Sequence, residues 1–250
     1  MIVLAVDTSS PQGSLALAQV SESKKSVKVI DQMTWTESSH HSDILTSQVQ
    51  AILMRNGIEL GQVQAVACGL GPGSFTGLRV AINFVRSLAY ALDIPIVSLN
   101  SLNLIALNAL PELQSFQKES LPPTVLCLVN AFRNMVYFAT YEVQRDQTDQ
   151  PLVEVIPPRA CRPEELASLL SPFASSYLGL GNGFGAYAGQ LPSALMERLD
   201  ILDQAEKNFP QAQTLAQWAL KYGKIGPWSD TKPLYIRASE PEEKLKIKGK

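Results

Sequence analysis

The sequence of 250 residues lacks the marks of several protein classes. Its three cysteines, Cys68, Cys127 and Cys161, are odd in number and widely spaced, unlike a disulfide framework or a cysteine metal site. It has no uninterrupted apolar run of about 18 residues, the length that suggests a membrane-spanning helix. It begins with a strand-like segment and lacks the basic start of a signal peptide. We therefore expect a reducing, cytoplasmic location and no contact with a membrane.

An excess of charge of one sign is also missing. The formal net charge is −2 and 18% of the residues are charged, so the chain lacks the basic character of an autonomous nucleic-acid binder. Hydrophobic residues make up 46% of the sequence, which is enough for a sizeable core. The length fits one large domain or two ordinary ones.

Histidine is scarce, and its placement argues against a metal site. His40 and His41 are the only two histidines. Histidines four residues apart share a helical face, whereas adjacent ones point about 100° apart. The chain has no His-Glu-x-x-His motif, no Gly-x-Ser-x-Gly motif and no paired cysteine and histidine motif. We expect no metal ligand and no catalytic residue, and a helix-start or packing role for His41, with His40 facing solvent.

The most informative feature present is a stretch that occurs twice. Residues 65–79 read AVACGLGPGSFTGLR, and residues 175–189 read SSYLGLGNGFGAYAG. Each is an apolar run that ends in Gly-Leu-Gly, passes through small residues and enters a helix-like segment. Backbone N–H groups at such a helix start can face an anion. The repetition indicates a duplicated α/β protein.

The flanking segments predict the same element order in both halves. In the first half we expect strands at 2–6, 14–19 and 27–35, a helix at 42–55, a strand at 63–68, a helix at 76–92, a strand at 94–99 and a helix at 101–110. In the second half we expect strands at 124–129, 135–143 and 152–156, a helix at 163–170, a strand at 177–180, a helix to about 196, a strand at 199–202 and a helix at 212–222. The fold class is α/β, and the order β-β-β-α-β-α-β-α, found twice, is that of two actin-like (ribonuclease H-like, ASKHA) lobes.

These elements predict two lobes and a tail. We place the first lobe at 1–110 and the second at 111–237, with a polar, Pro-bounded boundary at 110–123 and an exposed hairpin tip at 143–151. The last helix, at about 212–223, is a candidate to pack back on the first lobe. Residues 238–250 form a loose charged tail, which either contacts a polyanion such as tRNA or is a solvated chain end; glutamates beside its lysines favour the second.

Two roles remain open for the first Gly-rich loop. It is not a Walker A motif, because no Lys-Ser or Lys-Thr follows its last glycine. It is either an anion or nucleotide loop, vestigial or shared with a partner, or a tight turn in which Ser74 or Thr76 caps the helix. Asp7 and Ser9 either contribute to such a site or form a turn. The candidate residues are Asp7, Ser9, Gly71, Gly73, Ser74, Thr76 and Gly77.

The helix that follows this loop is apolar around most of its circumference. A helix on a sheet needs only one apolar face, so the surplus predicts a contact with another helix. We favour a partner protein; the alternative is that the helix at 101–110 covers the surplus, or that both helices form the interface together. The predicted interface residues are Arg79, Ile82, Phe84, Val85, Arg86, Leu88 and Ala89.

Three segments resemble one family. LAVDTSS near the start, CGLGPGSFTGLRVAI at 68–82 and KPLYIR at 232–237 are similar to the TsaB (YeaZ) family, from residue 1 to about 237. The resemblance implies a non-catalytic subunit that pairs with a TsaD-type catalytic subunit to make threonylcarbamoyladenosine in tRNA. It also implies a TsaE-type ATPase as a further partner, a homodimer when alone and only indirect contact with tRNA. ATP and metal would belong to the partner subunits.

The chain departs from the family pattern in its second half. Relatives resemble DARxGEVY where this chain has NAFRNMVY at 130–137, so an uncharged Asn130 stands opposite Asp7 of the first half. A Mg–phosphate site requires anionic oxygen ligands. This substitution argues against the alternative of a self-sufficient ATP-dependent kinase. A metallopeptidase is a second, weaker alternative.

Overall fold

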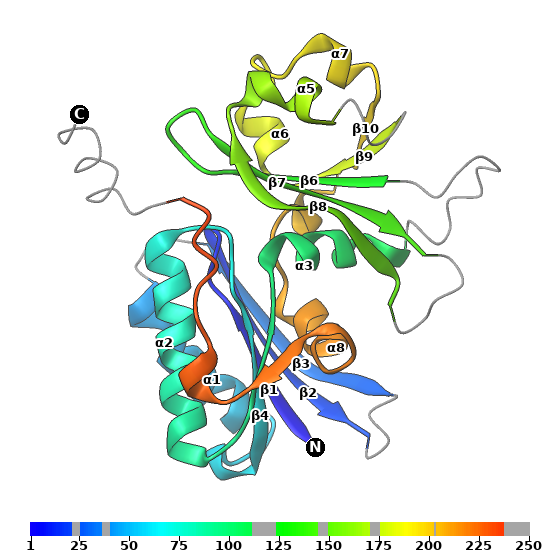
Figure 1. Ribbon diagram of the computed structural model, residues 1–250. Helices are drawn as coiled ribbons and strands as arrows, with labels where there is room; N and C mark the ends of the chain where they lie inside the picture. Colours follow the sequence, from blue (N-terminus) through cyan, green and yellow to red (C-terminus); the bar gives the residue numbers. More distant parts are fainter. Residues whose placement is uncertain are drawn as a thin grey trace.

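The chain forms five layers: two sheets, a group of helices on the outer side of each sheet, and helices between the sheets (Figure 1). The computed structural model describes residues 1–21, 26–36, 41–111, 124–144, 150–170, 176–202 and 204–237. The expected tail and most of the expected boundary segment and hairpin tip lie outside these residues. None of the described helices is long and apolar enough to cross a membrane.

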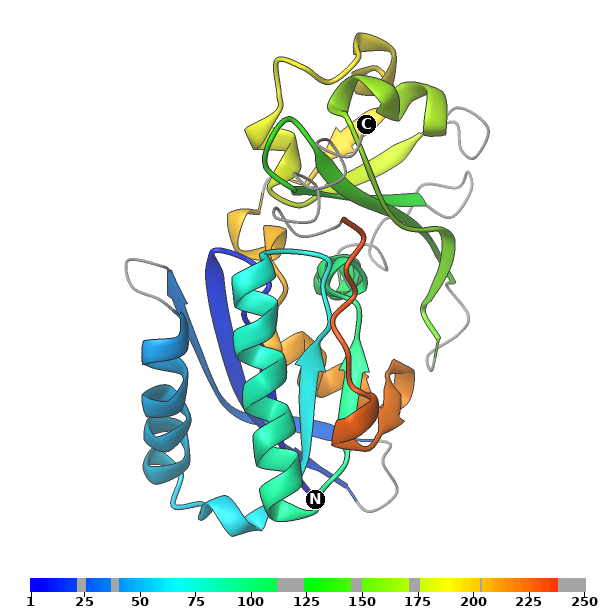
Figure 2. The same cartoon turned by 60° about the vertical axis from the view of Figure 1, so that its left-hand side comes forward.

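The first sheet has the strand order β11-β5-β4-β1-β2-β3. Strand β1 pairs antiparallel with β2 and parallel with β4, and β4 pairs parallel with β5. Helices α1 and α2 cover its outer face (Figure 2). The elements of this lobe are β1 (Ile2–Asp7), β2 (Gln12–Val20), β3 (Val27–Thr36), α1 (His41–Arg55), β4 (Val63–Gly69), α2 (Phe75–Leu92), β5 (Ile96–Leu99) and α3 (Ser101–Asn108).

The second sheet repeats this order as β10-β9-β6-β7-β8. Its strands pair in the corresponding way, with β6 antiparallel to β7 and parallel to β9. The same topology in both halves agrees with the duplicated α/β fold that the sequence predicts. The elements in the second half of the sequence are β6 (Thr124–Asn130), β7 (Val136–Val143), β8 (Leu152–Cys161), α5 (Leu166–Leu170), β9 (Tyr177–Leu180), α6 (Gly183–Ala186), α7 (Ser193–Met196), β10 (Leu199–Ile201), α8 (Ala212–Tyr222) and β11 (Lys224–Gly226).

The last helix in each half of the sequence packs on the sheet of the other half. Helix α8 packs across β1, β2 and β3 of the first sheet, and β11 then joins that sheet beside β5. Helix α3 packs instead on β6 and β7 of the second sheet and touches α8. All eight residues of α3 are buried, because the helix lies between the sheets. One apolar cluster therefore joins the two lobes, and the inner sheet faces, α3 and α8 all contribute to it.

The long helix expected after the second Gly-rich loop does not form. The structure has two four-residue helices there, α6 and α7, separated by turns. The segment between them contains Gly189 and ends at Pro192, which precedes the first turn of α7. Glycine and proline weaken a helix interior, so the segment breaks where its first-lobe counterpart continues for 18 residues.

Candidate functional site

Asp7 lies at the carboxyl end of β1 and is enclosed by the protein. Its exposed fraction is 0%, and no cation contacts it among the described residues. Its Oδ1 accepts hydrogen bonds from the Ser9 backbone N–H at 2.8 Å and the Ser9 hydroxyl at 2.6 Å. Its Oδ2 accepts one from the Ser101 hydroxyl at 3.2 Å. The carboxylate is thus bonded on both oxygens by neighbours from its own lobe.

Burial governs the protonation of this group. Removal from water disfavours the charged carboxylate and raises the pKa of Asp7, although the hydrogen bonds from Ser9 and Ser101 act in the opposite direction. The buried thiol of Cys68 lies nearby, and its pKa is also raised, first by burial and then by the charge of Asp7. An enclosed carboxyl with a raised pKa is a poor ligand for Mg²⁺, which requires an ionised oxygen donor open to the ion and its waters.

The Gly-rich loop directs its backbone N–H groups into the protein. The Gly71 N–H donates to the Ser101 hydroxyl at 3.0 Å, and the Ser74 N–H donates to the Ser9 carbonyl at 2.7 Å. The Ser74 hydroxyl accepts from the Gly77 N–H at 3.2 Å, so Ser74 caps α2 as the structural alternative expected. Thr76 is exposed at the start of the helix. Three N–H groups of the loop, those of Gly71, Ser74 and Gly77, are therefore already bonded to protein oxygens.

Two glycines in this loop permit the close approach of the turn after β1. A Cβ atom on Gly77 would lie 1.9 Å from the Thr8 carbonyl oxygen, and one on Gly73 would lie 2.1 Å from the Ser9 carbonyl oxygen. The Thr8 hydroxyl donates to the Gly77 carbonyl at 2.7 Å. Because even a Cβ atom would overlap these carbonyl oxygens, no side chain or phosphate fits between the turn and the loop at these two glycines.

His41 fastens the same turn from the other side. The Trp35 indole N–H donates to His41 Nδ1 at 3.0 Å, so Nδ1 carries no proton, and Nε2 donates to the Ser10 carbonyl at 3.0 Å. This geometry requires the neutral tautomer and uses both ring nitrogens. His41 therefore packs β3 and α1 against the turn after Asp7. His40 lies outside the described residues, and no group of three or more potential metal ligands occurs among those described.

Asn130, the second-lobe counterpart of Asp7, is also hydrogen-bonded within the protein. The Asn130 side-chain oxygen accepts from the Phe132 N–H at 2.8 Å and from the Tyr187 hydroxyl at 2.9 Å. Residues 132–134, which follow shortly after, all have positive φ angles between 53° and 57°. Arg237 donates to the carbonyls of Ala131 and Phe132 and supports this turn. The turn is therefore held by its own lobe and by the end of the described chain.

Fewer residues of α2 face solvent than the sequence suggested. Four of the predicted interface residues are at most 9% exposed and pack on the first sheet, so their assignment to a partner interface is wrong: Ile82, Val85, Leu88 and Ala89. Arg79 is exposed, and Phe84 and Arg86 are half-buried. The suggestion that α3 covers α2, or joins it at an interface, is also wrong, because α3 lies on the opposite side of the sheet.

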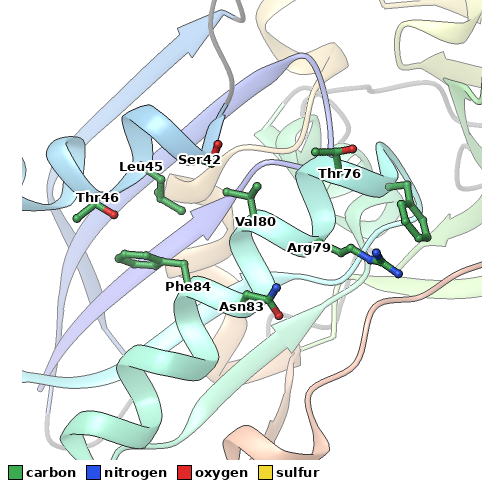
Figure 3. Close-up of a pocket in the computed structure, with 9 residues that line it drawn as sticks. Ser42, Leu45, Thr46, Thr76, Arg79, Val80, Asn83 and Phe84 are labelled. Atoms are coloured by element: carbon green, nitrogen blue, oxygen red, sulfur yellow. The ribbon is translucent and has the colours of Figure 1, made fainter.

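A groove of about 410 Å³ lies on the outer surface between α1 and α2. Figure 3 shows Phe84 pointing toward α1, and Arg79 pointing away from it toward the last described segment of the chain. The lining residues are Ser42, Leu45, Thr46, Phe75, Thr76, Arg79, Val80, Asn83 and Phe84. This surface combines apolar atoms with one arginine and is large enough to receive side chains from another helix.

Arg79 is held at one end of this groove. Its guanidinium lies 3.9 Å from the centre of the Phe75 ring, and its Nε donates to the Tyr235 hydroxyl at 3.1 Å. The rings of Phe75 and Tyr235 stack with their centres 4.9 Å apart. The arginine is therefore presented in a fixed orientation by residues from two distant segments.

Sequence reasoning missed Ser101 and Tyr235 as parts of this region. A signal for Ser101 existed, because it follows β5 just as Asp7 ends β1 and Gly69 ends β4. The carboxyl ends of neighbouring parallel strands meet at one edge of a sheet, which brings the three positions together. The contact of Tyr235 with Arg79 spans 156 positions and has no local signal.

Comparison with known proteins places this structure among described families. The sequence model of the family TsaD, tRNA N6-adenosine threonylcarbamoyltransferase, matches residues 30–180. The protein TsaB of Haemophilus influenzae, named for tRNA threonylcarbamoyladenosine biosynthesis, is 27% identical over 98% of this chain and 97% of its own length. TsaB of Escherichia coli is 26% identical over 82% of this chain and 84% of its own. The structure of YeaZ from Pseudomonas aeruginosa superposes with a TM-score of 0.72, at 28% identity, over 94% of this chain and 99% of that one.

Two lobes with the same strand order and a shared core define an α/β protein of the actin-like class. The chain belongs to the TsaD family and, within it, to the TsaB (YeaZ) proteins.

Proposed function

We propose that this protein is a non-catalytic subunit that binds and activates a TsaD-type threonylcarbamoyltransferase. The reaction is the transfer of a threonylcarbamoyl group to N6 of the adenosine next to the anticodon in tRNA. The pathway comes from the names of the relatives, which are tRNA threonylcarbamoyladenosine biosynthesis proteins. In this proposal the partner carries the chemistry, and ATP and metal bind to partner subunits, with a TsaE-type ATPase joining the assembly.

The closed turn around Asp7 is the observation that carries the proposal. Both carboxylate oxygens are bonded to serines of the first lobe, and three of the loop N–H groups are bonded to protein oxygens. The opposing position carries Asn130, which is bonded to Tyr187. Phosphoryl transfer depends on metal-bound phosphates held between such positions. Asp7 is fully buried and Asn130 carries no carboxylate, so neither position presents an accessible carboxylate ligand, which supports an accessory role.

The surface between α1 and α2 is the best candidate for the partner. Phe84 and Arg79 lie on it, and Met54 of α1 is 82% exposed near the far end of that helix. Aromatic, methionine and arginine side chains are enriched at protein interfaces. In this proposal the same surface forms a homodimer when the chain is alone, and a TsaD-type subunit replaces the second copy.

Reconstitution tests the proposal. The purified chain is mixed with the TsaD-type subunit, the TsaE-type ATPase, tRNA, ATP and an enzyme that generates the threonylcarbamoyl adenylate, and modified tRNA is measured. We expect modification only when this chain and the TsaD-type subunit are both present. Modification or ATP turnover by this chain alone would instead support a self-sufficient kinase-like protein. Modification that is equal with and without this chain would contradict activation.

A further inference from the structure

The last described segment, residues 227–237, lies along α2 and ends at the second lobe (Figure 1). We call it the C-terminal strap. At its start, the Trp228 ring packs edge-on against Tyr90 near the end of α2, with 5.2 Å between ring centres. Further along, the Leu234 N–H donates to the Leu70 carbonyl at 2.8 Å. At its end, Arg237 bonds the 131–132 carbonyls of the second lobe. These contacts fix the course of the strap across both lobes.

Aromatic rings remain exposed along this course, although most large apolar side chains are buried. Tyr90 is 69% exposed, Trp228 38%, Tyr235 41% and Phe132, in the turn that Arg237 supports, 61%. Each of the first three makes a ring contact that restricts its orientation, and each stays partly exposed to solvent. Fixed, exposed rings are suited to stacking with planar groups.

Basic side chains alternate with these rings. Lys232 is exposed within the strap, Arg133 lies in the adjoining turn, and the Arg86 guanidinium lies 5.7 Å from the Trp228 ring centre. Arg237, at the end of the strap, donates through Nη1 to the turn carbonyls. The strap and the turn contain one carboxylate, Asp230. This line is therefore positive on a chain whose net charge is −2.

We propose that the C-terminal strap and the 131–134 turn form a contact surface for RNA. Basic side chains interleaved with exposed rings match the two parts of a polynucleotide, since the cations bind phosphates and the rings stack with unpaired bases. Trp228–Asp230 forms a short helical turn, and the seven residues from Thr231 to Arg237 span at most about 25 Å if extended, enough for several nucleotides. The inference rests on the proposed function, which supplies tRNA as the RNA. It assigns direct contact to residues of this chain, whereas the sequence suggested only an indirect contact.

The test measures tRNA binding by the full chain and by its complex with the TsaD-type subunit. The probe is a fluorescently labelled transcript of a tRNA with an adenosine next to the anticodon, followed by anisotropy at several salt concentrations. The test variant is the double substitution Lys232→Glu and Arg133→Glu. The control for a charge reversal elsewhere is the single substitution Lys28→Glu, at an exposed position on β3, away from the strap. Both variants are first shown to have the thermal midpoint of the wild type.

We expect the double variant to bind the tRNA at least about tenfold more weakly than the wild type at low salt, and the control to bind as the wild type does. Loss of two phosphate contacts should also reduce the slope of log affinity against log salt by about 1.5. Equal tRNA affinity and salt slope for wild type and double variant would overturn the inference. Weaker binding of the TsaD-type subunit with unchanged tRNA binding would also overturn it, because the surface would then serve a protein.

A second readout separates this inference from the proposed function. Photo-crosslinking of a 4-thiouridine-containing transcript to the wild-type chain should label peptides with Trp228, Tyr235 or Phe132. Crosslinks confined to other peptides would contradict the surface, even if the chain activates its partner. Crosslinks at these peptides without activation in reconstitution would leave the RNA surface standing and overturn the accessory function.

Discussion

The two Gly-rich loops begin alike and lead to different structures. In the first lobe the loop enters α2, an 18-residue helix whose outer side borders a groove. In the second lobe it enters α6, a helix of four residues. The sheets beneath the loops have the same strand order. The comparison shows that the sheet preserves the duplication, whereas the helices that follow the loops have diverged.

The two strand ends that face these loops also differ. Asp7 is a carboxyl group buried without a cation among the described residues, and Asn130 is neutral and bonded to Tyr187. Either arrangement keeps its turn rigid, but neither offers an open anionic ligand.

The largest expected effect is a loss of stability when a charge is placed on the buried side of α2 instead of the surface of α7. Ile82→Glu should destabilise the protein by about 4 kcal/mol or prevent folding, because it buries a charge at a side chain that is 2% exposed. Met196→Glu, at a position that is 37% exposed on α7, should change the free energy of unfolding by less than about 1 kcal/mol. Urea unfolding followed by circular dichroism measures both. Similar losses in the two variants would contradict the burial difference.

The glycines of the two loops give the next contrast. Gly77→Ala should cost about 3 kcal/mol, because its Cβ would lie 1.9 Å from a backbone oxygen that cannot move freely. Gly185→Ala in α6 has no atom within 4 Å of the new Cβ and should be neutral or stabilise by about 0.5 kcal/mol. Thermal unfolding of the pair measures the difference. Equal midpoints would show that the first loop is not packed on the turn after β1.

A substitution on the outer side of α2 tests the partner surface. Phe84→Glu places a charge at a half-buried side chain that lines the groove. We expect it to weaken binding of the TsaD-type subunit by about 2 kcal/mol while the chain stays folded. Isothermal titration calorimetry measures the affinity, with Met196→Glu as the control on the other lobe. Undiminished affinity for Phe84→Glu would move the interface away from this groove.

The raised pKa of Asp7 predicts a pH dependence that Asn130 cannot have. The native state retains a proton on Asp7 at pH values where the unfolded chain, with its ordinary pKa of 3.8, has lost it. The contribution of Asp7 to the free energy of unfolding is therefore fully present below that pH. It is lost as the pH rises through the raised pKa. The stability of the wild type relative to Asp7→Asn should therefore fall as the pH rises above about 4. Unfolding at each pH measures this difference, and Asp200→Asn, an exposed carboxylate of β10, is the control. A difference that rises with pH would reverse the sign of our assignment.

The smallest effect is expected when the second lobe receives a carboxylate. Asn130→Asp keeps an oxygen for the Tyr187 hydroxyl, but the Asp7 turn stays closed. We expect no measurable ATP hydrolysis by this variant, as assayed by phosphate release with Mg²⁺. Turnover gained by this one change would show that the first-lobe site is open to nucleotide.

The element order was predictable because apolar periodicity and turn residues are local signals. They gave β1 to β9 and α1 to α3 with shifts of a few residues. The break between α6 and α7 was missed because an apolar segment was extended through Gly189 and Pro192. The assignment of Ile82 and Val85 to an interface failed for another reason. Periodicity shows that a helix has two apolar sides, but only the packed sheet shows which side remains exposed.

The sequence predicted which residues form the site, but it did not predict whether the site is open or closed. Asp7, Ser9 and the loop glycines, named as candidates from the sequence, do lie together. Whether they form an open site or a closed turn depends on Ser101 and on backbone contacts between distant segments. Such contacts leave no pattern in a single sequence, so both readings of the loop were consistent with it.

The most direct test of the account is reconstitution with Asp7→Asn. The variant keeps an acceptor for Ser9 and removes the carboxylate that any metal or phosphate chemistry in this chain would use. The account predicts that Asp7→Asn activates the TsaD-type subunit to the same extent as the wild type. A folded Asp7→Asn chain that binds the partner normally but supports at least tenfold less tRNA modification would contradict it.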